Sequence, residues 1–92
     1  MPIITFSGKV SDAESTAVHL SVAGPEHFFF SKSYEDSFSE KLNLQSGDYL
    51  VFVSAFSDGD FIFNASGGNS SINPSVPDDY AKKSKQSYQL TV

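Results

Sequence analysis

Apolar residues recur at every second position through most of this chain, and clusters of Gly, Pro, Asn, Asp and Ser interrupt the alternation. A period of two is typical of strands that bury one face, because successive side chains of a strand point to opposite sides. The pattern predicts seven strands, at about residues 3–10, 16–23, 27–34, 38–44, 49–57, 60–65 and 86–92. Turns separate them at intervals of about 8–12 residues, which favours a single all-β domain over residues 1–92, an antiparallel β-sandwich.

Two residues break the alternation inside predicted strands. Gly8 lies within the first strand, where a glycine often marks a β-bulge, so we expect a bend in the register there. Glu40 falls on the face that Phe38 and Leu42 would bury, and an inward carboxylate is costly. We expect Glu40 near the open end of its strand or on a short edge strand, where a charge discourages pairing with another molecule.

The longest apolar segment runs from residue 49 to residue 57 and is apolar on both faces, which predicts a central strand. The tetrapeptide Ser57-Asp58-Gly59-Asp60 follows it. Asp-Gly between two β-rich runs suits a type I′ turn, because glycine accepts the positive φ angles that this turn requires. We therefore expect a tight hairpin in which Phe56 faces Phe61 and phenylalanines gather on one side.

Residues 67–79 consist largely of Gly, Asn, Ser and Pro, with Ile72 and Val76 as the possible anchors. We expect a long loop here, because these residue types favour turns and cannot fill a core. Loops on a rigid scaffold commonly carry recognition, so this loop, which contains Asn69, is one candidate surface for a partner. An edge strand is the other.

Composition excludes several classes of function. The chain has no Arg, and its 6 Lys against 11 acidic residues give a net charge of −5, which argues against a nucleic-acid partner. The absence of Cys excludes disulfides and thiolate zinc sites. No apolar run approaches the ~20 residues of a membrane helix, so we expect no membrane insertion by this domain. Lysines cluster at positions 82, 83 and 85, which is more typical of a solvated edge than of a binding patch.

Three short segments of the chain resemble a known family. They read Phe6-Ser7-Gly8-Lys9-Val10-Ser11-Asp12, Asp36-Ser37-Phe38 and Leu42-Asn43-Leu44-Gln45-Ser46-Gly47-Asp48-Tyr49-Leu50-Val51. The Gly-x-Val strand and the Gly-Asp-Tyr strand start are similar to those of transthyretin-like, carboxypeptidase-regulatory-like modules of extracytoplasmic bacterial proteins. The likeness covers about residues 4–57, and it departs from the family at Ser37, where a Gly is usual.

The resemblance implies a transthyretin-like or immunoglobulin-like sandwich that serves as an accessory module, such as a spacer or a scaffold piece of a cell-surface protein. Modules of this family generally lack catalytic residues. A shared fold does not carry function with it, so the residues themselves are considered next.

The residues offer no constellation for catalysis. Nucleophilic hydrolysis needs a His beside a Ser and a carboxylate, and neither His19 nor His27 lies in such a motif. We expect no catalytic residue. The loop carboxylates Asp58, Asp60, Asp78 and Asp79 are ligands that calcium accepts, but turn chemistry explains them as well, so no metal or other cofactor is expected.

These observations favour a noncatalytic accessory or protein-interaction module in the periplasm or at the cell surface, although no signal peptide is visible in the chain. A protein is the expected partner. Two alternatives stay open: a small carbohydrate-binding module and a calcium-stabilised adhesive domain. The candidate surface residues are Phe29, Tyr34, Asn69 and Tyr80, of which Phe29, Tyr34 and Tyr80 would form the stacking surfaces for a sugar. Nine of the aromatic residues are Phe and none is Trp, which weighs against sugar binding because Phe lacks a polar tip.

Overall fold

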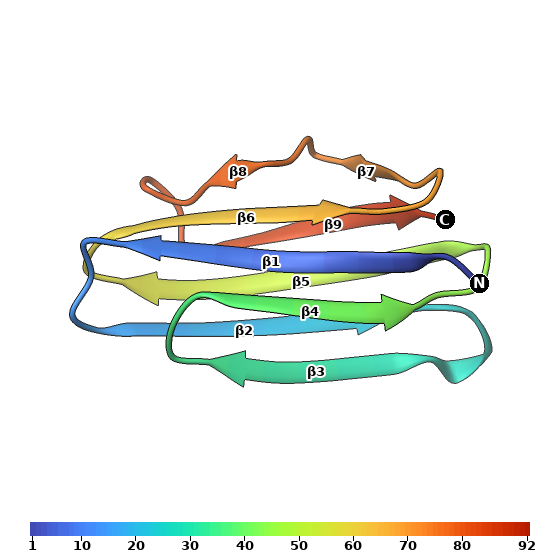
Figure 1. Ribbon diagram of the computed structural model, residues 1–92, viewed down its shortest axis with the longest axis horizontal. Coiled ribbons are helices and arrows are strands. Elements are labelled where there is room, and N and C mark those ends of the chain that lie inside the picture. The colour runs from blue at the N-terminus through green and yellow to red at the C-terminus, as the bar shows by residue number, and fades with distance from the viewer.

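The computed structural model describes residues 1–92 as two antiparallel sheets packed face to face (Figure 1). Sheet A has the strand order β4-β1-β6-β8, and sheet B has the order β3-β2-β5-β9-β7. The strands are β1 (Ile3–Ser11), β2 (Thr16–Ala23), β3 (Phe29–Tyr34), β4 (Phe38–Asn43), β5 (Asp48–Ser57), β6 (Asp60–Ser66), β7 (Ser71–Asn73), β8 (Asp78–Asp79) and β9 (Lys85–Thr91). The predicted all-β sandwich is confirmed. The structure has no helix that could span a membrane.

All seven predicted strands are present, and the predicted loop 67–79 adds two short ones. β7 joins the edge of sheet B beside β9, and β8 joins the edge of sheet A beside β6. Ile72 and Val76 pack against the core from this segment, as predicted for its anchors. The third strand begins later than predicted, because Glu26 and His27 adopt positive φ angles of 57° and 64° in a 3-10 turn (Pro25–His27).

The core lies between the two sheets and consists of the inward side chains of alternate strand positions, together with Leu44 and Tyr80. The buried strand residues are Ile4, Phe6, Val18, Leu20, Val22, Tyr49, Val51, Val53, Ala55, Phe61, Phe63, Ala65, Tyr88 and Leu90. In the absence of disulfides, burial of this apolar surface, at about 25 cal/mol per Å², is the main stabilising contribution.

The bulge predicted at Gly8 is absent, because the pairing register is continuous on both sides of it. Gly8 faces Phe38 of β4 and Phe63 of β6 in unbroken ladders. A Cβ atom there would collide with the rings of Phe38 and Phe61. The absence of a side chain at Gly8 therefore leaves room for aromatic rings in the core, and the strand does not bend there.

The hairpin predicted at Asp58-Gly59 is wrong. β5 and β6 belong to different sheets, so the connection between them crosses from sheet B to sheet A. β5 pairs with β2 and β9, and β6 pairs with β1 and β8. Gly59 has no positive φ; a side chain there would instead collide with the carbonyl oxygens of Ser11 and Asp12. The turn preference of Asp58-Gly59 is outweighed by pairing with strands distant in sequence: β6 pairs along its whole length with β1, and β5 pairs with β2.

Asp58 anchors this crossing. Its Oδ1 accepts hydrogen bonds from the backbone N–H groups of Glu14 and Ser15, at 2.9 and 3.1 Å, and its own N–H donates to the Ser15 carbonyl. The carboxylate thus ties the β5–β6 connection to the β1–β2 connection, and both cross between the sheets at this end of the molecule.

Glu40 lies on an edge strand, as predicted. β4 is the outer strand of sheet A, and Glu40 accepts a hydrogen bond from the Tyr34 hydroxyl at 2.7 Å. Its Oε1 also lies 3.5 Å from Nζ of Lys32, which points inward from β3, the outer strand of sheet B. Inward charges on neighbouring edges disfavour pairing with a further strand. The opposite edges of the sheets are formed by β7 and β8, which have three and two residues. Strands this short offer few backbone groups for pairing with another chain.

β5 is the central strand of sheet B, as predicted, but only one of its faces is buried. Leu50 and Phe56 are 57% and 68% exposed. Sheet A covers the inner face of β5, and nothing in this chain covers its outer face, although both faces are apolar.

Candidate functional site

The outer face of sheet B is the surface that five strands turn away from the core. Its residues align in rows through cross-strand pairing. The first row is Phe29, Ala23, Leu50, Gln89 and Asn73; the second is Ser31, Ser21, Phe52 and Ser87; the third is Ser33, His19, Ser54 and Lys85; and the fourth is Ala17 and Phe56. The face therefore combines apolar side chains with serine hydroxyls and amides.

Three large apolar side chains stand exposed on this face. Phe29 is 66% exposed, and Leu50 and Phe56 are exposed to a similar degree. Single exposed apolar residues are ordinary, whereas larger contiguous apolar patches on protein surfaces are typical of interaction sites.

The outer face of sheet A differs in charge. Its pairing rows carry Lys9, Lys41, Asp60 and Asp79 among Ser, Thr and Asn residues, with Ile3 and Ile62 as its exposed apolar side chains. On sheet B, Lys85 is the charged residue of the four rows, and Asp48 precedes them at one end of β5. Depletion of charge with enrichment of aromatic residues distinguishes the cores of protein interfaces from other surfaces.

His19 is held in the third row by two serine hydroxyls. Its Nε2 lies 2.7 Å from Oγ of Ser31, and its Nδ1 lies 2.9 Å from Oγ of Ser33. No carboxylate is among its hydrogen-bond partners. The arrangement orients the imidazole across the β2–β3 pair, where it contributes a polar, flat side chain to the outer face.

Two shallow hollows lie at opposite ends of this face. One, of about 520 Å³, is lined by Ala23, Gly24, Pro25, Asp48, Tyr49, Leu50 and Gln89. The other, of about 350 Å³, is lined by Ala17, Val18, His19, Ser33, Ser54, Ala55, Phe56 and Ser84. The first hollow is framed by apolar side chains at the start of β5, and the second adjoins Phe56 near its end.

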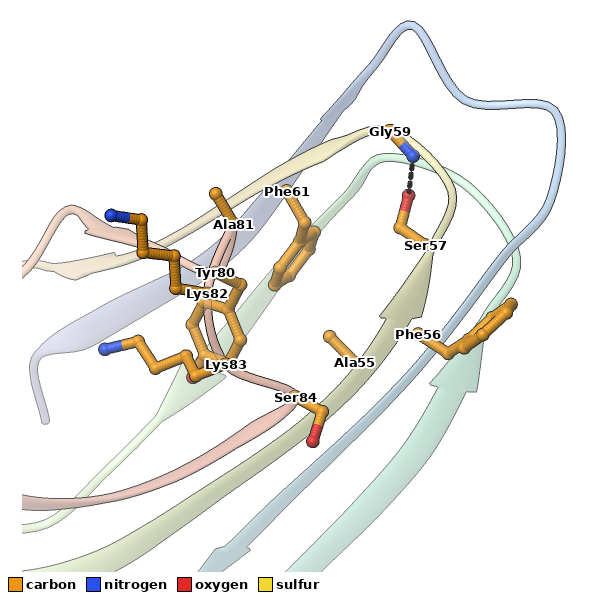
Figure 2. Close-up of a pocket in the computed structure, with 10 residues that line it drawn as sticks. All are labelled: Ala55, Phe56, Ser57, Gly59, Phe61, Tyr80, Ala81, Lys82, Lys83 and Ser84. Carbon is orange, nitrogen blue, oxygen red and sulfur yellow. Dashed lines mark hydrogen bonds between the residues drawn. The ribbon is translucent and has the colours of Figure 1, made fainter.

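A separate groove of about 460 Å³ lies between the end of β5 and the loop that leads into β9. Figure 2 shows the rings of Phe61 and Tyr80 between these segments, with Ser57 and Gly59 on the opposite side from the two lysines. Lys82 and Lys83 extend away from Ser57 in this view. Nζ of Lys83 lies 2.7 Å from Oδ1 of Asp78, so this ammonium group is engaged within the protein.

Beneath the groove, Tyr80, Tyr88 and Asp78 form a chain of hydrogen bonds. The Tyr80 and Tyr88 hydroxyls are 2.7 Å apart, and Tyr88 donates to Oδ2 of Asp78 at 2.6 Å. Burial raises the pKa of Tyr80 to about 12, although its bond to Tyr88 acts in the opposite direction. Burial and the bonds to Asp78 and Tyr80 also raise the pKa of Tyr88. Burial alone would raise the pKa of Asp78, but the bonds from Lys83 and Tyr88 outweigh it and lower that pKa.

The structure does not bring the four predicted surface residues together. Phe29 lies on the outer face of sheet B, and Asn69 is exposed in the turn after β6. Tyr34 is half-buried, stacked on Phe38 with ring centroids 3.9 Å apart. Tyr80 is only 6% exposed and belongs to the core, so it presents no stacking surface.

Sequence reasoning did not select Leu50, Phe52 and Phe56 as surface residues, because it assigned their segment, which is apolar on both faces, to a central strand. The neighbouring strands held the information that could have corrected this. Their outward positions, Ser21 of β2 and Ser87 of β9 among them, are polar. A second covering layer would bury those hydroxyls as well, at a cost.

The carboxylates considered for calcium do not gather at one point. No group of three or more His, Asp or Glu side chains is arranged to hold a metal ion. Asp58 accepts N–H groups of the β1–β2 connection, Asp79 accepts the N–H of Ala81 within its own turn, and Asp78 is bonded to Tyr88 and Lys83.

No family model, curated protein or solved structure matches this chain.

Proposed function

We propose that this chain is a noncatalytic β-sandwich domain that binds another protein through the outer face of sheet B. The observation that carries the proposal is the exposure of Phe29, Leu50 and Phe56 on a face that is almost free of charge. Covering these side chains would remove apolar surface from water at about 25 cal/mol per Å². The complementary partner surface is apolar at its centre and polar at its rim.

The open face supports binding better than the strand edges do. Lys32 and Glu40 place charges along the β3 and β4 edges, and these disfavour the addition of a strand. The β7 and β8 edges are too short to template a partner strand. The predicted loop is also less free than expected, because Ile72 and Val76 fix it to the core.

A protein partner is favoured over a sugar by the chemistry of the exposed rings. Sugar-stacking platforms usually use Trp or Tyr, whose polar tips hydrogen bond at the edge of the ring. Here Tyr34 is half-buried and Tyr80 is buried, which leaves phenylalanines on the open face. Phenylalanine and leucine side chains suit a desolvated protein interface.

The test compares the two outer faces. Proteins captured from an extract of the source organism are identified with the wild type, with F29S/F56S and with the matched control I3S/I62S on sheet A. The affinity of each captured and purified protein is then measured by calorimetry. We expect a partner whose affinity falls at least about tenfold in F29S/F56S and is unchanged in I3S/I62S. Equal binding by all three proteins would contradict the proposal.

A glycan panel tests the alternative. Amide chemical shifts of the wild type are followed during titration with oligosaccharides. We expect no saturable shifts, whereas saturable shifts in β2, β3 and β5 would favour a carbohydrate-binding module instead. The extracytoplasmic location and the transthyretin-like relationship stay predictions.

A further inference from the structure

We propose that the partner of the outer face of sheet B is a second copy of this chain, related by a two-fold axis that crosses the strands at the row of Phe52. This inference rests on the proposed function, because it uses the same face. A two-fold interface requires a surface that complements itself, so that a contact between two positions occurs twice. The outer face meets this requirement in shape and in charge.

The first and third rows of the face, which lie on either side of the row of Phe52, complement each other. A two-fold axis through that row places the first row of one copy against the third row of the other. Phe29 then lies opposite Ser33, and Leu50 lies opposite Ser54. Ser33 and Ser54 line the hollow of about 350 Å³, so exposed apolar side chains of one copy face a recess in the other.

Phe56 has a matching recess at the other end. The same axis places Phe56 of one copy opposite Asp48 of the other, at the beginning of β5 and beside Leu50. The hollow of about 520 Å³ lies there, and Ala23, Pro25 and Leu50 supply its apolar walls. Each end of the face therefore carries an exposed apolar side chain, Leu50 or Phe56, beside a hollow.

The charges of the face favour this orientation. Lys85 lies opposite Gln89 of the second copy, one row from Asp48, and the long lysine side chain can reach that carboxylate. An axis parallel to the strands would instead place Asp48 opposite Asp48. Like charges in apposition weaken an interface, so the axis that crosses the strands is the favoured one.

The size of the face predicts a weak dimer. Five strands about 4.8 Å apart and the four rows cover roughly 500 Å² per copy, or about 1,000 Å² in total, which is the lower limit for a specific interface. We expect a dissociation constant on the order of micromolar, so the dimer forms at concentrations that hydrodynamic methods reach.

Sedimentation equilibrium of the purified full chain tests the proposal between about 1 μM and 1 mM. We expect a monomer–dimer equilibrium whose dissociation constant rises at least about tenfold in F56S and is unchanged in I62S on sheet A. Circular dichroism and thermal unfolding establish that both variants fold, and both altered residues are exposed. A wild type that remains monomeric at 1 mM, or a dimer that F56S leaves intact, would overturn the inference.

A charge exchange tests the orientation. D48K and K85D are each expected to weaken the dimer about threefold or more, and D48K/K85D to restore it, because the pair is re-formed with opposite signs. Failure of the double variant to recover would rule out this axis.

Cross-linking gives an independent measure, because the chain has no cysteine of its own. Ser87 lies in the row of the axis, so the two copies of this residue face one another across sheets about 10 Å apart. We expect a short bis-maleimide to cross-link S87C and not S39C on sheet A. If the chain is monomeric but F29S/F56S still loses a captured partner, the self-association fails and the proposed function stands.

Discussion

The hydroxyl groups of Tyr80 and Tyr88 lie 2.7 Å apart between the two sheets, and Tyr88 donates onward to Asp78 at 2.6 Å. Because the Tyr88 proton is directed at the carboxylate, Tyr80 is the donor to Tyr88. Lys83 completes the chain at Asp78 and also lies over the Tyr80 ring, 5.4 Å from its centroid. The network joins β8, β9 and the loop between them at the edge of the sandwich. It adds contacts to β8, which has only two residues of its own.

Tyr88→Phe should destabilise the domain by about 1–3 kcal/mol, because Tyr80 loses its acceptor and Asp78 loses a donor in a buried place. Tyr80→Phe is the matched control. It removes one hydroxyl and leaves the bond from Tyr88 to Asp78 intact, so its cost should be smaller, at about 1 kcal/mol. Urea unfolding of both variants and the wild type measures the difference. A larger loss in Tyr80→Phe would contradict this account of the network.

The lowered pKa of Asp78 makes part of the stability sensitive to acid. A carboxyl whose pKa is lower in the folded state contributes stability above its unfolded pKa, and that contribution is lost as the pH falls through the folded pKa. We expect the wild type to be more stable than D78N near pH 6 and the difference to shrink below about pH 4. Urea unfolding from pH 6 to pH 2 follows this difference. A stability difference between the wild type and D78N that stays constant from pH 6 to pH 2 would show that ionisation of Asp78 does not contribute to stability.

The tyrosines predict the opposite behaviour in alkali. The pKa of Tyr80 is raised from 10.0 to about 12 in the folded state. The protonated hydroxyl therefore contributes its full stabilisation of the fold below pH 10, and this stabilisation is lost as the pH rises through the folded pKa. The stability difference between the wild type and Y80F should therefore narrow above pH 10. Chemical unfolding from pH 8 to pH 11.5, followed by circular dichroism, tests this. A gap that widens in alkali would contradict the raised pKa.

Asp58→Ala and Asp60→Ala should differ although the two residues flank the same glycine. Asp58 accepts N–H groups of Glu14 and Ser15, so its loss should cost about 1–2 kcal/mol. Both side chains are exposed, but the Asp60 carboxylate makes no such hydrogen bond, so its loss should change the free energy of unfolding by less than about 0.5 kcal/mol. Thermal and urea unfolding compare the two variants. Equal losses would argue against the crossing of the chain at this point and for a simple hairpin turn.

Most of the strands could be predicted from the sequence, because alternation of apolar and polar residues is a local property that any one-sided strand must show. Val18, Leu20 and Val22 of β2 are buried, and His19 and Ser21 point outward, as that alternation requires. The cost of an inward charge left two places for Glu40, the open end of its strand or an edge strand, and the structure shows the edge strand.

The pairing of strands could not be predicted from neighbouring residues. Asp58 and Gly59 have the composition of a tight turn, yet the chain crosses between the sheets there, because β5 pairs with β2 and β6 pairs with β1. Gly8 likewise has a role only once the rings of Phe38 and Phe61 are placed around it.

The sequence by itself determined that this chain forms β-strands with one buried side, and which residues of most strands lie on that side, because burial and pleating act on each strand separately. The tertiary structure decided which strands share a sheet and which apolar face of β5 remains uncovered. Both depend on contacts between residues far apart in the chain, and a face is covered or open only with respect to the other sheet. Phe56 is therefore a surface residue in this protein, although its own segment is typical of a buried strand.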